Sequence, residues 1–258
     1  MTSNLGCVGL AVADVDELAE LLDAVVPTGT AYRQADGSVL YVWTDASGAR
    51  LTVTTDRRGE IDTVVPSYAA EPGATLAGLA ALHERIVIAD VVEDGEVATR
   101  LVAEVLPPEP VPGSGATTLT ALGVDVSLHA SVEEYEASDA ALLTAPDEDR
   151  EEEENEAREP LRMGSESFIS YGAFSPSDTA RPLARLAGRV LGVQTATVEI
   201  TGQAFHAVRV RTVGMELDVC LAADDHADPP VEGGVVAGTV WLVADVVRPT
   251  KRRRWWGR

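Results

Sequence analysis

The sequence is poor in positive charge and in aromatic side chains. Its 258 residues contain 20 Lys and Arg against 42 Asp and Glu, which gives a formal net charge of −22. A surface with this charge repels polyanions, which excludes a general nucleic-acid binder. Aromatic residues make up only 5% and hydrophobic residues 45%, so Val, Leu and Ala must build the core. The length allows one large domain or two of ordinary size.

Cysteine is nearly absent as well. Cys7 and Cys220 lie far apart and are too few for a disulfide framework or a Cys/His zinc cluster. We therefore expect no cofactor and no metal. The chain does not begin with a basic stretch followed by an apolar run, and it lacks a window of about 18 apolar residues. These features predict a reduced, cytoplasmic location.

The N-terminal residues predict a β-α-β-β-β module. Residues 4–13 have the continuous apolar character of a buried strand. A helix is expected over 14–27, with Asp14 as N-cap and Glu17 completing a capping box. Turn residues then separate three short strands, at 30–34, 38–46 and 49–55.

The stretch VGLAVADVDEL, within residues 5–54, resembles the opening of the vicinal-oxygen-chelate family, which includes glyoxalases and extradiol dioxygenases. The resemblance implies a divalent metal held by a His of the first strand and a Glu of the last. Here Cys7 stands at the His position, and the last strand offers Thr52 and Thr54 but no carboxylate. A thiol suits a soft metal and fits oxygen activation poorly. The usual alternative for such a cysteine is a small buried apolar residue.

An internal repeat of about 60 residues is expected further along the chain. SYAAEPGATLAGLAAL begins at Ser67, and SYGAFSPSDTARPLARLAG begins at Ser170. The two copies end alike, with DVSLHA at 125–130 and DVCLAA at 218–223. Chance similarity between Ala/Val-rich segments is the alternative. Within the first copy we expect a loop and a short helix over 67–84.

The composition divides the chain into two domains. Residues 144–160 carry nine acidic residues against two arginines, which is typical of a solvated linker. We therefore expect an α+β protein with mainly antiparallel sheets. The predicted parts are an α+β domain at 1–143, an acidic linker at 144–162, a mostly β domain at 163–247 and a basic tail at 248–258.

Candidate binding residues are few. On a strand, Arg209 and Arg211 point to the same side and could flank an anionic ligand. The alternative is that both simply face solvent. The four histidines show no i, i+4 pair. His226 lies in an acidic turn, which is more typical of an exposed loop than of a cation site.

The C-terminal segment contains five cationic residues among its last eight, with two adjacent tryptophans. It could dock on an acidic protein surface, including the chain's own 147–159 run, or on an anionic membrane. Nucleic acid is the least favoured partner, a homodimer is also open, and a tail without a role is the alternative. The candidate partner-binding residues are Lys251, Arg252, Arg253, Arg254, Trp255 and Trp256.

No nucleophile elbow, P-loop or dinucleotide-binding glycine motif is present in the sequence. We therefore expect a non-catalytic cytoplasmic binding or protein-interaction protein. The alternative is a glyoxalase-like, metal-dependent lyase or dioxygenase. The scarcity of lysine, with Lys251 as the single one, and the segments SYAAEPG and ESFISYGAF resemble proteins of high-GC actinobacteria.

Overall fold

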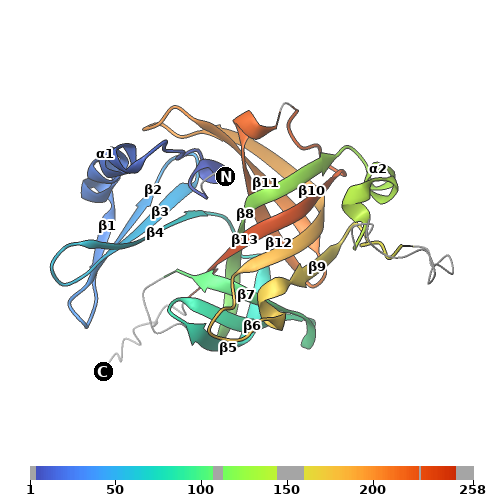
Figure 1. Cartoon of the computed structure of the whole chain (residues 1–258), viewed down its shortest axis with the longest axis horizontal. Coiled ribbons are helices and arrows are strands. Elements are labelled where there is room, and N and C mark those ends of the chain that lie inside the picture. The colour runs from blue at the N-terminus through green and yellow to red at the C-terminus, as the bar shows by residue number, and fades with distance from the viewer. Residues whose placement is uncertain (1–3, 107–112, 144–159, 227, 248–258) are drawn as a thin grey trace, which may run out of the picture.

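The computed structural model describes residues 4–106, 113–143, 160–226 and 228–247 (Figure 1). The fold consists mostly of antiparallel and mixed sheet with few helices, in agreement with the predicted α+β class. The helical elements are short: η1 (Gly6–Val8), α1 (Val15–Val25), η2 (Val26–Thr28), α2 (Val132–Ala137), η3 (Asp139–Ala141), η5 (Tyr171–Phe174) and η6 (Ala223–Asp225).

Residues 4–68 form the N-terminal module. Its four strands pair antiparallel in the order β1-β2-β3-β4. Helix α1 lies beside this sheet in Figure 1, and its buried Leu21, Leu22 and Val25 share one core cluster with Leu51 of the sheet. The strands are β1 (Thr30–Arg33), β2 (Val39–Thr44), β3 (Ala49–Thr55) and β4 (Ile61–Tyr68).

The strand expected at residues 4–13 is wrong, because the chain forms the 3-10 turn η1 at this point. Gly9 adopts a left-handed φ of 72° and closes the turn. The backbone N–H groups of Val8 and Leu10 both donate to Leu5 O. Cys7, Val8 and Leu10 are nevertheless buried. An apolar run therefore identified the buried residues but did not distinguish a strand from a turn.

Helix α1 begins as the sequence predicts. The Asp14 carboxylate accepts from the N–H groups of Asp16 and Glu17, both at 3.0 Å. The Glu17 carboxylate accepts from Ala13 N at 2.7 Å, one residue before the N-cap. Together these bonds satisfy three backbone donors at the start of the helix.

The remaining nine strands form one sheet, in the order β11-β12-β8-β5-β6-β7-β13-β10-β9. Two further pairings, β11–β10 and β8–β13, close this sheet on itself. The strands are β5 (Ala74–His83), β6 (Ile86–Glu93), β7 (Glu96–Val105), β8 (Ser114–His129), β9 (Ser167–Ser170), β10 (Leu183–Thr197), β11 (Ala204–Thr212), β12 (Met215–Ala222) and β13 (Val235–Val246).

The closing pairings produce two rings of five strands that share β8 and β13. The first ring runs β5-β6-β7-β13-β8 and the second runs β10-β11-β12-β8-β13. Each ring has one parallel contact, β7–β13 in the first and β12–β8 in the second. Strands β5 to β8 therefore pair with one another and with the shared strands in the same pattern as β10 to β13.

This pattern differs in detail from the sequence alignment of the repeat. The segments from Ser67 and Ser170 lead into β5 and β10, which occupy matching places in the two rings. The segments 125–130 and 218–223, however, end β8 and β12, whereas the pairing pattern matches β8 with β13. Strands from both sides of residues 144–162 also share the closed sheet, so the two predicted domains have one sheet in common.

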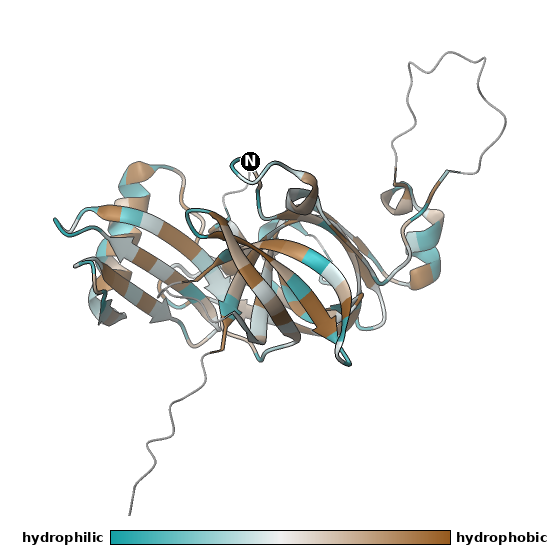
Figure 2. Ribbon diagram, turned by 90° about the horizontal axis from the view of Figure 1, so that it is seen from below, coloured by the Kyte–Doolittle hydropathy of each residue, from teal (hydrophilic) through white to brown (hydrophobic). Residues whose placement is uncertain are grey.

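The helix expected within residues 67–84 is wrong, because residues 74–83 form β5. Ala and Leu favour helices locally, but β5 pairs with β6 on one side and with β8 on the other. Pairing on both sides overrides the local preference. One large core cluster contains buried side chains from every strand between β5 and β13. Hydrophobic and hydrophilic bands alternate along these strands in Figure 2, as expected where one face is buried.

Candidate functional site

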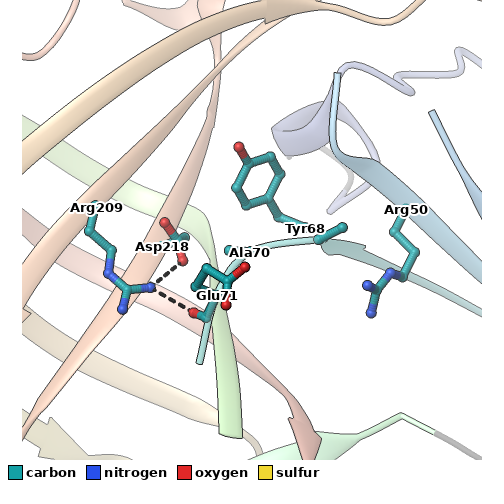
Figure 3. A pocket seen from close by; sticks show the side chains of 7 residues that line it. Arg50, Tyr68, Ala70, Glu71, Arg209 and Asp218 are labelled. Atoms are coloured by element: carbon teal, nitrogen blue, oxygen red, sulfur yellow. Dashed lines mark hydrogen bonds and ion pairs between the residues drawn. The ribbon is translucent and has the colours of Figure 1, made fainter. Parts of the chain in front are cut away.

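A cavity of about 540 Å³ lies where the N-terminal module meets the second ring. It forms where β4 ends and residues 69–73 carry the chain across to β5. We call it the junction pocket. Figure 3 shows Arg50 on one side and Arg209 with Asp218 on the other. The lining residues are Arg50, Tyr68, Ala69, Ala70, Glu71, Arg209 and Asp218.

On the ring side, Arg209 of β11 is surrounded by acceptors. Its Nη1 donates to Asp218 Oδ2 at 2.8 Å and to the backbone oxygen of Glu71 at 3.1 Å. Its Nε donates to Glu216 Oε2 at 3.2 Å. A Cβ at Gly73 would lie 2.5 Å from the backbone oxygen of Glu216, so this close approach of two backbone segments requires glycine. Arg209 therefore holds the connecting segment 69–73 against the second ring.

Asp218 is the most buried charged group of the pocket. Its side chain is 8% exposed, and burial raises the pKa of its carboxyl even though the Arg209 guanidinium opposes the shift. Among the described residues, only Arg209 bonds its carboxylate, through Oδ2. The negative charge of Asp218 is therefore incompletely stabilised, and the group has room for another donor.

On the module side, Arg50 of β3 reaches toward β13. Its Nη1 donates to Asp245 Oδ2 at 2.6 Å, which joins the module to a strand shared by both rings. Its Nε is buried and has no partner among the described residues. A buried donor without an acceptor costs about 1–3 kcal/mol. The Arg50 side chain is 20% exposed, so the end of its guanidinium is the part that can reach the pocket.

Tyr68 forms a fixed wall between these two sides. Its hydroxyl donates to Gln194 Oε1 at 3.0 Å, and its backbone N–H donates to Thr120 Oγ1 at 3.2 Å. Its ring meets Phe205 edge to face, with centroids 6.0 Å apart. Burial raises the pKa of the Tyr68 hydroxyl, with smaller contributions from Cys220 and Asp218. The phenol is therefore neutral near pH 7 and held in position.

The structure separates the two arginines that the sequence proposes as a pair. Arg209 lines the junction pocket, but Arg211 does not. Arg211 instead forms an exposed ion pair with Glu166, with Nη2 and Oε1 3.3 Å apart. Joint binding of an anion by these two residues stays a prediction. The tail residues 251–256 lie outside the described part of the chain.

Cys7, the candidate metal ligand, is part of the core. Its Sγ donates to the backbone oxygen of Gly123 at 3.2 Å. Burial raises the pKa of its thiol to about 11, and Asp225 adds to the shift. Cys7 borders a smaller cavity of about 210 Å³ together with Asp225 and His226. Within the described ranges, no group of three or more His, Cys, Asp or Glu side chains is placed to hold a metal ion.

Little in the sequence pointed to the other pocket residues. Arg50, Tyr68 and Glu71 come from the N-terminal part of the chain, and the fold brings them to β11 and β12. Asp218 carried the one local signal, because it is a charged residue inside the apolar strand MELDVCLA. A buried carboxylate normally needs a partner, and β11 provides Arg209.

No protein-family model, curated protein or solved structure matches this chain. The junction pocket is therefore interpreted from its own residues and contacts. In the part of the chain that the structure describes, no helix combines the length and the apolar character needed to cross a membrane.

Proposed function

We propose that the protein is a non-catalytic binding protein that holds a small polar molecule in the junction pocket. The observation that carries this proposal is the cavity of about 540 Å³ with two guanidinium and two carboxylate groups in its lining. Ligand cavities typically measure about 300–1,000 Å³ and contain a few fixed polar groups. The ion pairs of Arg50 and Arg209 supply such fixed groups.

The alternative is a glyoxalase-like, metal-dependent lyase or dioxygenase that uses Cys7 as a ligand. A cysteine must lose its proton to bind a metal. The Cys7 thiol is buried, donates to Gly123 O, and has a pKa raised to about 11. These contacts favour a role for Cys7 in packing, and they support binding without catalysis.

We further propose a cytoplasmic location and a gene duplication behind the two rings. Both cysteines are free thiols, which suits a reducing compartment. The matching pairings of β5–β8 and β10–β13 support descent from one repeated unit. The basic tail remains a proposed docking element for an acidic protein. A chain ending at Val247 should then lose salt-sensitive partners from an extract.

Native mass spectrometry of the full chain, equilibrated with the low-mass fraction of a cell extract, tests the binding proposal. The wild type should carry an added small mass. The double variant R50M/D218N should lose it, while R100M, which changes an exposed ion pair outside the pocket lining, should keep it. Release of the compound with its mass unchanged supports binding without turnover. If the wild type and the double variant carry the same added compound, the proposal is contradicted.

A further inference from the structure

The two sides of the junction pocket differ in charge. On the ring side, Arg209 lines the pocket with the carboxylates of Asp218 and Glu71, and Glu216 outside the lining also pairs with Arg209. This side is therefore negative. The module side contains Arg50 and Asp245, which neutralise one another. Among the described residues, however, the Arg50 guanidinium makes one hydrogen bond, from Nη1 to Asp245, and its side chain is 20% exposed. One end of the pocket therefore offers a guanidinium that can still donate, and the other end offers excess acceptors.

We propose that the junction pocket binds a small zwitterion, such as an amino acid or a short peptide, with its carboxylate at Arg50 and its ammonium group at Asp218 and Glu71. This inference rests on the proposed binding function and names the ligand class. The ligand carboxylate accepts from the exposed end of the Arg50 guanidinium, while its ammonium group donates to Asp218 and Glu71.

Ligands with a single charge fit the same pocket less well. A simple anion that reaches Arg209 meets Asp218 and Glu71, which already accept from that guanidinium. A simple cation satisfies Asp218 but makes no bond with the exposed end of the Arg50 guanidinium. A molecule with both charges can form a charge-assisted hydrogen bond at each end of the pocket. Such bonds are stronger than those between neutral groups.

The raised pKa of the Asp218 carboxyl fits this arrangement. Burial makes its charged form costly despite Arg209, and a bound ammonium group would lower that cost. Tyr68 is fixed by Gln194 and Thr120, so the wall between the two ends needs little rearrangement on binding. Such preorganisation favours affinity because fewer groups must be ordered.

The test is a titration of the isotope-labelled full chain with defined probes, followed by NMR. The probes are glycine, 4-aminobutanoate and 6-aminohexanoate, which place the two charges at increasing separation, together with the dipeptide Gly-Gly. Hexanoate and hexylamine serve as single-charge controls. We expect saturable shifts at residues 69–73 with at least one zwitterion, and about tenfold weaker binding of its single-charge analogues.

Matched variants test which end of the pocket binds the carboxylate of the ligand and which end binds its ammonium group. R50M keeps the aliphatic stem but removes the donor, and it should weaken zwitterion binding about tenfold while hexylamine binding is unchanged. D218N should weaken the zwitterion similarly, and R100M should leave it unchanged. If hexanoate or hexylamine binds as tightly as every zwitterion, the ligand class is wrong although the pocket still binds. If no probe shifts residues 69–73, the zwitterion inference is wrong. The proposed function is then tested separately, by native mass spectrometry of the compounds that the protein binds from the extract.

Discussion

The two rings have matching strand pairings but differ in the segment that leads into each of them. Residues 69–73 lead into β5 and lie against β12 of the second ring, where Glu216 N donates to Gly73 O at 2.8 Å. Residues 171–182 lead into β10, and their η5 turn packs against β7 of the first ring. The short segment borders the junction pocket. The long segment is buried near its two ends, at Gly172 and Ala180, while residues 174–179 are exposed. A Cβ at Gly172 would lie close to Arg181 and Val102.

Hydrogen bonds and buried side chains anchor the long segment near its two ends. Ala180 is 1% exposed, and its backbone oxygen bonds His83 Nε2 at 2.8 Å. Val102 N donates to Ser170 Oγ at 2.9 Å. The same strand pattern therefore carries a pocket beside the short segment in one half, and a long segment anchored near both ends in the other. The difference lies in the length of a connection, which is where folds usually acquire function.

The hairpins β11–β12 and β6–β7, against which these two segments pack, also differ. Arg209 pairs with Asp218 across β11–β12, and Asp90 pairs with Arg100 across β6–β7 at 2.7 Å. The charges are exchanged between the strands. The first pair lies beneath the connecting segment, whereas the Arg100 side chain is 60% exposed. The Arg209–Asp218 pair lines the pocket because it lies beneath residues 69–73. Within the described residues, the Asp90–Arg100 pair has no such cover and stays on the surface.

The largest effect should come from the strands that both rings share. Leu242 of β13 is fully buried in the main core cluster, so Leu242→Ala should lower the free energy of unfolding by about 2–5 kcal/mol. Urea denaturation followed by circular dichroism measures this. Val97→Ala, at a position 61% exposed on β7, is the control and should change little. Equal losses would mean that the shared strands are not the centre of the fold.

The anchored end of the long segment should be more sensitive to added volume than open positions are. A Cβ at Gly172 would lie 2.2 Å from Arg181 O, whereas one at Gly192 meets nothing within 4 Å. Gly172→Ala should therefore cost about 1–3 kcal/mol, and Gly192→Ala should be close to neutral. Thermal unfolding of the two variants checks the contrast. A neutral Gly172→Ala would show that Gly172 does not pack closely against Arg181 and Val102.

The two hairpin ion pairs should differ in their contribution to stability. Arg209→Met leaves the buried Asp218 carboxylate without its donor, which we expect to cost about 1–2 kcal/mol, since Arg209 retains some exposure. Arg100→Met should change the unfolding free energy by no more than the experimental error. A double-mutant cycle with Asp218→Asn should recover much of the loss. Additive effects in that cycle would contradict a direct interaction.

The smallest effect concerns pH. Burial lowers the pKa of His206 in β11 from its ordinary 6.5, and His226 adds to the shift. The unfolded chain then binds more protons than the folded chain between the two pKa values. Stability from this group is present above 6.5 and falls as pH drops through the folded pKa. Unfolding from about pH 7.5 to about pH 5 should show a shallower decline for His206→Gln. Parallel curves would contradict this assignment.

The sequence predicted local features well where one residue decides the structure. Asp14 and Glu17 cap α1 through backbone bonds that depend only on neighbouring residues. The same reasoning did not reveal β5, since its strand pairing depends on β6 and β8. It also missed the turn at Cys7, because burial alone does not specify backbone conformation.

The junction pocket shows the same limit. Arg209 was proposed as a binding residue from its place in a strand, and it does line the pocket. Its partner Arg211 does not, because Glu166 pairs with it on the surface. Arg50 was not singled out, since its ion pair with Asp245 forms only when β3 meets β13. The type of a binding residue could be predicted, but the set of residues that meet in space could not.

Hydrogen–deuterium exchange of the full chain, with and without the low-mass fraction of a cell extract, tests the central claim most directly. The claim is that the half with the short connection binds a ligand and the half with the long connection does not. It predicts slower exchange in residues 69–73 and unchanged exchange in residues 171–182. Unchanged exchange in both segments, or protection confined to residues 171–182, would contradict it.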